Sequence, residues 1–273
     1  MTLLDEIWLH FDDSVRTTLR NPIWLVFGLF QPLLWLVLFA PLLVNLDGPQ
    51  MFASVDALAI LASGLMVLLA LYGSVCVGFG LLPEVRAGGL DRPSVTPAHR
   101  TALVLGRTLR DLVVLLGLSI LLLGIAWTID LGASAASVHT ALGVVLLIGM
   151  LLALCSYALA LVLTNEDGLA ATLNLVTLPL VLLSSVMLPL MLAPGSIRAA
   201  ADLNPFFYAV DAVNALVDDE TIVAAAGRGL VVAGALALLA TGWTAHAIYR
   251  AAAQRRHEPP GREGHKRFLE QGR

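Results

Sequence analysis

The side chains that could carry acid–base chemistry are few and stand apart along the chain. Between two long apolar runs, the stretch TNEDG places Glu166 beside Asp167, and paired carboxylates are common tools of general acid–base catalysis. A catalytic pair needs a cleft around it, whereas this stretch is only a few residues long. We therefore interpret it as a solvated turn.

Ligands for a metal ion or a nucleotide are missing at the required spacings. His139 and His246 stand near the ends of apolar runs without a partner at metal-ligand spacing, and Cys76 and Cys155 fall inside such runs, where small core residues are expected. A phosphate-binding loop needs Gly-Lys-Ser/Thr, but the sole lysine, Lys266, lies in the tail. We predict no catalytic, cofactor-binding or metal-binding residue on this chain, and no enzyme.

The largest polar insertion, LLPEVRAGGLDRPSVTPAHRTALVLGRTLRD at 81–111, contains residues that place helix ends. Pro83 suits the first turn of a short helix, and the helix dipole favours Glu84 beside it. Gly88-Gly89 can end that helix or let another backbone come close. The insertion therefore predicts a short transverse helix.

A long helix is predicted to follow. Thr96-Pro97 fits an N-cap and a first helical position, from which a helix can run unbroken to about Ile129, with Arg107 and Asp111 paired one turn apart. Its first turns would project from the membrane. The alternative, a solvated basic loop, explains the arginines of the insertion but not the placement of its Gly and Pro residues.

The composition requires lipid around the chain. Of its 273 residues 58% are hydrophobic and only 13% charged, against about a quarter in soluble domains, and the mean hydropathy is +0.86. A bilayer-spanning helix needs about 20 apolar residues. We predict an all-α polytopic membrane protein with six transmembrane helices, at about 23–46, 57–82, 110–129, 139–164, 169–192 and 228–249.

Basic residues predict the orientation of these spans. With both termini in the cytoplasm, the inner segments hold fourteen of the sixteen arginines and lysines, which leaves Arg198 and Arg228 outside, where the loops are acidic. The insertion at 81–111 is then cytoplasmic. No charged residue lies deep in a predicted span, which argues against transport coupled to an ion.

The two ends of the chain have different characters. Residues 1–256 are predicted to form one transmembrane domain, and the polar tail 257–273, with Pro259-Pro260, is predicted to be disordered. Before the first span, apolar residues recur at helical spacing among charged ones, which predicts an amphipathic helix lying in the inner interface, with an ordinary soluble helix as the alternative. Those apolar residues are Leu4, Ile7, Trp8, Phe11, Val15 and Leu19.

Two loops carry a resemblance to a family. The stretch EVRAGGLDRPSVTPAHRTALVLGRTLRDLV resembles the first intracellular loop of type-2 ABC export permeases, especially the daunorubicin-resistance-like subgroup. The outer segment LPLMLAPGSIRAAADLNPFFYAVDAVNAL is similar to the loop before the last span in the same family. The matching positions of the first loop are Glu84, Gly88 or Gly89, Asp91-Arg92, Thr96-Pro97, Arg100 and Gly106 to Asp111. Those of the second are Leu203-Asn204-Pro205, Tyr208 and Val210-Asp211.

The resemblance implies a six-span permease subunit of the bacterial inner membrane that exports an amphipathic substrate such as a drug, a glycolipid or a polyketide-like molecule, as in multidrug resistance. It implies two copies of a separate ABC ATPase, which would hold ATP and Mg, and a second permease copy in a homodimer or a paralogue in its place. Lipid is a partner, and nucleic acid is not expected. The open alternatives are a membrane-embedded lipid-modifying enzyme and a non-transporting membrane assembly protein.

The same resemblance assigns residues to two roles. The cytoplasmic insertion would be the coupling helix that seats in the ATPase, through Glu84, Gly88, Gly89, Asp91, Arg92, Thr96, Pro97 and Arg100. The outer segment breaks at Pro194-Gly195 and Asn204-Pro205 into pieces too short to span a bilayer, and we expect short re-entrant helices that cap the export path, or a surface helix pair as an equal alternative. The predicted outer gate is Asn204, Pro205, Phe206, Tyr208 and Asp211.

Overall fold

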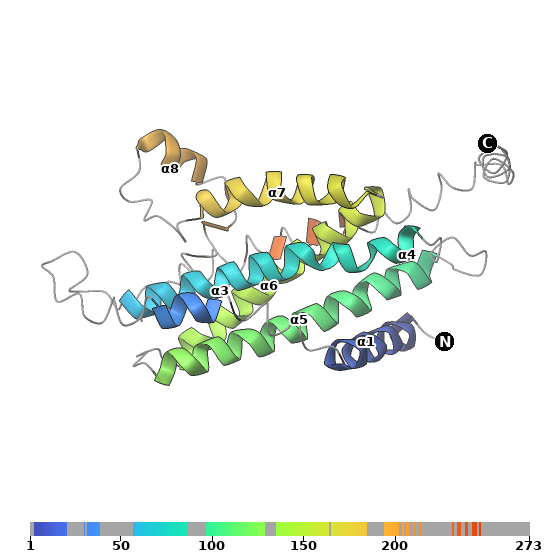
Figure 1. Cartoon of the computed structure of the whole chain (residues 1–273), viewed down its shortest axis with the longest axis horizontal. Coiled ribbons are helices and arrows are strands. Elements are labelled where there is room, and N and C mark those ends of the chain that lie inside the picture. Colours follow the sequence, from blue (N-terminus) through green and yellow to red (C-terminus); the bar gives the residue numbers. More distant parts are fainter. Residues whose placement is uncertain are drawn as a thin grey trace, which may run out of the picture.

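The computed structural model describes a bundle of helices (Figure 1). The described residues are 3–20, 30, 32–38, 57–86, 97–128, 135–163, 165–184, 194–201 and single positions or short groups between 204 and 246. Every regular element within these residues is helical, as the apolar runs predict.

Three long helices pack against one another in this bundle. They are α3 (Ala57–Val75), α5 (Pro97–Thr128) and α6 (Ala135–Val162). Among the described residues, three segments are long and apolar enough to cross a membrane, namely Leu61–Gly80, Ala102–Thr128 and Val138–Val162. They agree with the second, third and fourth predicted spans.

The chain leaves α3 through a tighter turn. A 3-10 helix, η1 (Cys76–Gly80), follows α3 directly and leads into the short helix α4 (Leu82–Arg86). The short helix predicted around Pro83 is therefore present. Cys76 is exposed on η1 and not in the core, because the 3-10 turn shifts the side chains that follow Val75 relative to the face that α3 buries.

Helix α5 begins at Pro97 and ends at Thr128, so the long unbroken helix predicted from Thr96-Pro97 is confirmed. At 1.5 Å per residue its 32 residues span about 48 Å, longer than a hydrocarbon core of about 30 Å. The extra length is available to carry its first turns beyond the apolar layer.

Two apolar clusters hold the bundle together. The main cluster joins α3, α5 and α6 along most of their length, with fully buried Met66, Leu122 and Val144 among its members. A smaller cluster lies at the end of the bundle where α4 is found. In it, Val85 of α4 packs with Val104 of α5 and with Tyr157 of α6. The small cluster fixes α4 against the two long helices.

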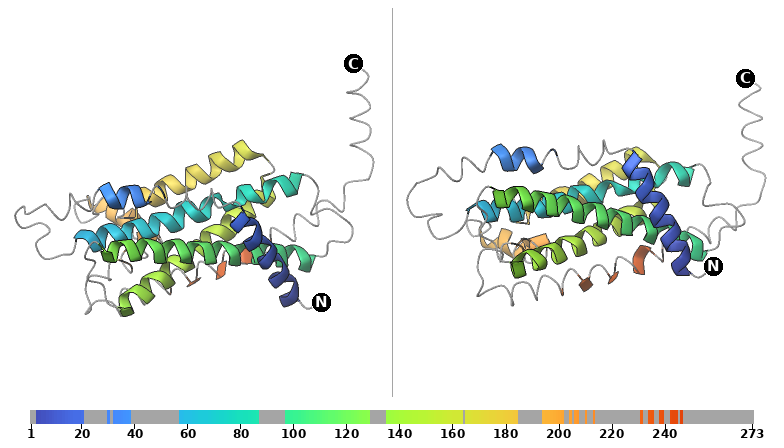
Figure 2. Two further views of the ribbon diagram at one scale, coloured as in Figure 1. Left: turned by 60° about the horizontal axis from the view of Figure 1, so that its bottom comes forward. Right: turned by 90° about the horizontal axis from the view of Figure 1, so that it is seen from below.

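The remaining described helices are shorter. Helix α1 (Leu3–Arg20) lies across the first half of α5, as the views of Figure 2 show. Helix α7 (Glu166–Leu182) begins after Asn165, whose side chain accepts a hydrogen bond from the Asp167 amide, and α8 is Gly195–Ala201. Glu166 and Asp167 are exposed, as predicted, but they form the first turn of α7 and not the isolated solvated turn that the sequence suggested.

Several predictions concern segments beyond the described residues. The first and sixth predicted spans lie mostly outside them, and the fifth lies inside them only as far as Ser184. The tail 257–273 and residues 87–96 of the insertion are also outside. Six spans and the disordered tail remain predictions.

Candidate functional site

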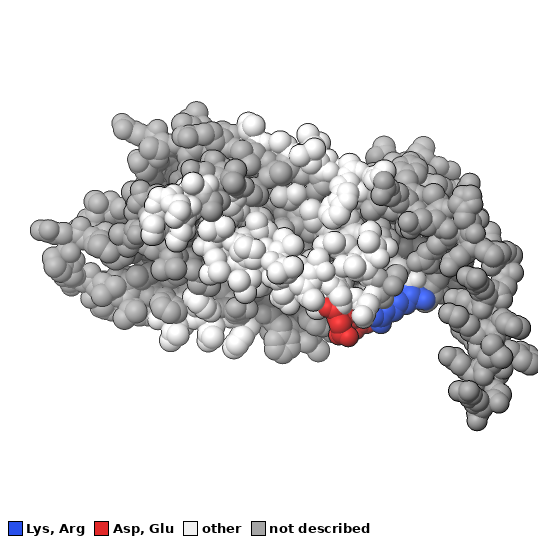
Figure 3. All heavy atoms as spheres, turned by 90° about the horizontal axis from the view of Figure 1, so that it is seen from above, with Lys and Arg blue, Asp and Glu red and all other residues white. Residues whose placement is uncertain are grey.

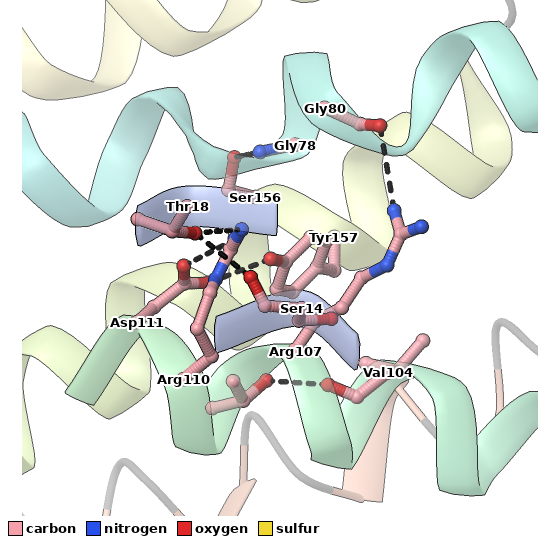
Figure 4. A network of polar contacts seen from close by, with 11 residues as sticks. Ser14, Thr18, Gly78, Gly80, Val104, Arg107, Arg110, Asp111, Ser156 and Tyr157 are labelled. Carbon is pink, nitrogen blue, oxygen red and sulfur yellow. Dashed lines mark hydrogen bonds and ion pairs between the residues drawn. The ribbon is translucent and has the colours of Figure 1, made fainter. Parts of the chain in front are cut away.

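Polar side chains gather where α1, η1, α5 and α6 meet, at the end of the bundle near α4 (Figure 4). They are drawn from four separate elements, and most of the bundle around them is aliphatic. We call this set the polar junction: Thr18, Gly78, Gly80, Arg107, Arg110, Asp111, Ser156 and Tyr157.

Helix α1 meets α5 at a glycine. A Cβ atom placed on Gly106 would lie 2.8 Å from His10 Cβ, 2.9 Å from the Ile7 carbonyl oxygen and 3.1 Å from the Phe11 amide nitrogen. Real Cβ atoms do not approach backbone so closely, so the contact between the two helices needs a residue without a side chain at 106. The amphipathic helix predicted at the N-terminus is therefore seated on α5, while Trp8 stays exposed.

A nearly buried carboxylate lies next to this contact. The hydroxyl of Tyr157, on α6, donates to Asp111 Oδ2 at 2.6 Å, and Arg110 Nη2 donates to Asp111 Oδ1. Arg110 also donates to Thr18 Oγ1 of α1 at 3.3 Å. The Asp111 side chain is only 11% exposed, and a buried charge requires such partners. Three helices therefore share one polar cluster.

The charged partner of Asp111 differs from the predicted one. The sequence pairs Asp111 with Arg107 one turn earlier, whereas the structure forms the ion pair with the adjacent Arg110. Arg107 Nη1 instead donates to the Gly80 carbonyl oxygen at 3.3 Å. The spacing rule for helix surfaces does not hold here because α1 and α6 cover this part of α5 and redirect both arginines.

The hydroxyl of Ser156 contacts the tight turn of η1. It donates to the Val75 carbonyl oxygen and accepts a hydrogen bond from the Gly78 amide at 3.0 Å. Ser156 is fully buried. Sequence reasoning missed this contact, since one serine in an apolar helix carries no periodic signal. Gly106, in contrast, stands in the Gly-Arg-x-Leu-x-Asp motif and could have been found.

The predicted coupling residues border this end of the molecule. Glu84 belongs to α4, while Pro97 and Arg100 belong to the first turn of α5, so these residues lie in the two helices that flank residues 87–96. Arg86 Nη1 lies 2.8 Å from Glu166 Oε1 in an exposed ion pair that ties α4 to the start of α7. The other predicted coupling residues, Gly88, Gly89, Asp91, Arg92 and Thr96, lie outside the described residues.

Charge is unevenly distributed over one face of the molecule (Figure 3). In Figure 3 the described basic and acidic side chains that are visible gather in one place, and the other described residues of that face carry no charge. The described part of this face that carries no charge suits contact with lipid tails.

The predicted outer gate packs inward where it is described. Phe206, Val210 and Val213 are buried in the main apolar cluster, and Asn204 is buried as well. The Asn204 side-chain amide donates to the Leu180 carbonyl oxygen at 2.9 Å, and its Oδ1 accepts from the Phe206 amide at 3.0 Å. The buried side chains of this segment thus face the bundle. Pro205, Tyr208 and Asp211 lie outside the described residues.

Known proteins resemble the chain along most of its length. Residues 5–217 match the family described as ABC-2 type transporter. The candidate transport permease ycf38 of Porphyra purpurea is 28% identical over 197 residues, which cover 71% of this chain and 67% of the relative. The proteins of the same name from Pyropia yezoensis and Cyanophora paradoxa are 26% and 28% identical, over 77% and 72% of this chain and 73% and 69% of their own lengths.

Proposed function

Because this chain belongs to the ABC-2 type transporter family, we propose that it is the membrane permease subunit of an ATP-driven exporter for an amphipathic substrate. The match across residues 5–217 carries the proposal, since it includes both helices that flank the cytoplasmic insertion. A drug, a glycolipid or a polyketide-like molecule fits the aliphatic bundle better than a hydrated ion does.

ATP hydrolysis belongs to a partner in this proposal. The chain has no Gly-Lys-Ser/Thr loop, so two ABC ATPase subunits would bind ATP and Mg and seat on the insertion between η1 and α5. A second permease copy would complete the transporter. Glu84 and Arg92 would pair with charges of the ATPase at a partly desolvated interface, and Gly88 and Gly89 would allow close approach of the two backbones.

Reconstitution tests the proposal directly. The full chain is purified from its native cells together with the ATPase that accompanies it, inserted into vesicles and supplied with ATP and daunorubicin, which is fluorescent. We expect ATP-dependent movement of the dye and no ATP binding by the permease alone. Movement that is independent of ATP would refute the proposal, as would a purified permease that no ATPase accompanies.

The insertion is tested with the same vesicles. Gly89→Leu and Glu84→Ala should abolish ATP-dependent dye movement while the protein still inserts and folds, because the ATPase could no longer seat. Asp12→Ala, which removes a partly exposed ion pair with Arg16 on α1, serves as the control variant. Transport at the unsubstituted rate in both coupling variants would show that the insertion is only a solvated basic loop.

The proposed orientation places both termini in the cytoplasm of a bacterial inner membrane. A reporter fused after Arg256 should be cytoplasmic, and a cysteine at Asp218 should react with an impermeant maleimide from outside. Outside labelling of a cysteine at position 90 would contradict the six-span arrangement.

A further inference from the structure

The junction between α3 and α4 is a 3-10 helix inside an otherwise α-helical segment. Residues Ala57–Val75 are α-helical, Cys76–Gly80 form η1, and Leu82–Arg86 are α-helical again. A 3-10 stretch in the middle of a helix often marks a hinge or a strained sequence. Here it stands at the end of a membrane-spanning segment and directly before the insertion.

A hydroxyl from another helix bridges this turn. Ser156 of α6 donates to the Val75 carbonyl oxygen and accepts from the Gly78 amide, two backbone groups only three residues apart. Figure 4 shows the Ser156 side chain reaching the ribbon at Gly78. A side chain that inserts into a helix's backbone ladder is a recognised cause of kinks. Ser156 therefore stabilises the backbone geometry of η1 from outside.

The bridge depends on one glycine. A Cβ atom on Gly78 would lie 2.6 Å from both the carbonyl oxygen and the hydroxyl oxygen of Ser156, while a Cβ atom on Gly73 or Gly80 would meet nothing within 4 Å. Only a glycine at 78 lets the two backbones approach closely enough for the hydroxyl to reach both groups. The neighbouring glycines have no such role and offer matched controls.

The geometry of η1 also determines which face α4 buries. Leu82 and Val85 are buried in the bundle, whereas Pro83 and Arg86 are exposed. A 3-10 helix rises about 2.0 Å and turns about 120° per residue, against about 1.5 Å and 100° in an α-helix. If the five residues of η1 became α-helical, α4 would move about 2.5 Å towards α3 and rotate by about 100°. Arg86 would then take the direction that Val85 has now.

We propose that Ser156 is a positioning residue that holds η1 in the 3-10 geometry, and that conversion of η1 to α-helix rotates α4 and re-aims the insertion. The functional part rests on the proposed export function, in which the insertion meets the ATPase. The structural part stands without it. At the other end of η1, Arg107 donates a hydrogen bond to the Gly80 carbonyl oxygen and so helps to hold the same 3-10 geometry.

Cysteine labelling of the full chain in nanodiscs tests the rotation. In a Cys76→Ala, Cys155→Ala background, a single cysteine replaces either buried Val85 or exposed Arg86, and its reaction with a water-soluble maleimide is timed. Ser156→Ala removes two hydrogen bonds that favour the 3-10 form of η1. The loss of each bond should change the ratio of the 3-10 form to the α-helical form by about three- to tenfold. We expect labelling at 85 to accelerate by about tenfold or more, and labelling at 86 to slow down.

Two matched controls and a second variant make the result specific. Gly78→Ala should also accelerate labelling at 85 and slow it at 86. Adding Ser156→Ala to Gly78→Ala should change these rates little further, because both substitutions break the same contact. Gly73→Ala and Ser119→Ala should leave both rates unchanged, since Gly73 has open space and the buried Ser119 hydroxyl has no hydrogen-bond partner among the described residues.

Three outcomes would overturn the proposal. The first is unchanged labelling rates in Ser156→Ala. The second is faster labelling at both 85 and 86, which would indicate that α4 loosens without rotating. The third is an equal change of the labelling rates in the control variants. The labelling needs no ATPase, so its failure would leave the export function standing. A failure of ATP-driven transport would likewise leave the labelling result unaffected.

Discussion

The two halves of α5 differ in their charges and in their surroundings. From Ala102 to Asp111 the helix is covered by α1 and carries Gly106 and the Arg110–Asp111 pair. From Val113 to Thr128 its outer face is open, with exposed Ile120 and Trp127. In the most apolar part of the α5 span only 28% of the residues are buried, against 67% and 61% in the corresponding parts of the spans that include α3 and α6.

The difference shows that the residues packed around a position decide what that position contributes to the structure. Gly106 has backbone of α1 within 3 Å of its missing Cβ, whereas Gly117 and Gly124 on the same helix have nothing within 4 Å. The covered half is therefore specified by close contacts and paired charges. The open half is specified only by being apolar, which is sufficient for a surface that meets lipid.

The largest expected effect is loss of the buried carboxylate. Asp111→Ala leaves Arg110 without its ion-pair partner in a mostly buried site, and breaking such a pair typically costs about 3–5 kcal/mol. We expect this loss in the free energy of unfolding, measured by titration with SDS. The control is Asp12→Ala, which breaks the exposed pair with Arg16 and should cost no more than about 0.5 kcal/mol. Equal losses of stability in Asp111→Ala and Asp12→Ala would show that the covered ion pair contributes no more than the exposed one.

The next effect isolates one hydrogen bond of the same carboxylate. Tyr157→Phe keeps the buried ring but removes the hydroxyl that donates to Asp111, and a hydrogen bond to a charged group contributes about 1.5–3 kcal/mol. The same titration measures it. In an Asp111→Ala background the loss should shrink towards zero, because the partner is already absent. A full loss in that background would show that the Tyr157 hydroxyl contributes to stability independently of Asp111.

The contact between α1 and α5 is the third target. Gly106→Ala places a Cβ atom 2.9 Å from the Ile7 carbonyl oxygen, and backbone cannot yield as a flexible side chain can, so α1 must shift at a cost of about 1–3 kcal/mol. We expect a lower SDS midpoint and faster proteolysis within residues 3–20. A variant with unchanged proteolysis would mean that α1 does not depend on this contact.

Sequence reasoning predicted those features of the fold that depend on local chemistry. Pro97 fixes the start of α5, and helical periodicity reveals α1, because a proline ring or an amphipathic pattern acts within a few residues. The contact of Asp111 with Tyr157 could not be predicted, since it depends on how α5 and α6 pack and joins residues 46 positions apart. The Ser156 bridge to Val75 and Gly78 has the same origin, with partners about 80 residues away.

The smallest expected effect has the opposite sign and tests the open half of α5. Gly117→Ala adds a Cβ atom where nothing lies within 4 Å and lowers the backbone entropy of the unfolded chain, so the helix should gain about 0.5–1 kcal/mol. The SDS midpoint should rise slightly, and proteolysis of residues 3–20 should not change. Gly124→Ala, with equally open space, should behave in the same way. A loss of stability in both variants, measured in nanodiscs, would mean that another surface packs closely on this face and that the two halves of α5 are both covered in the assembled protein.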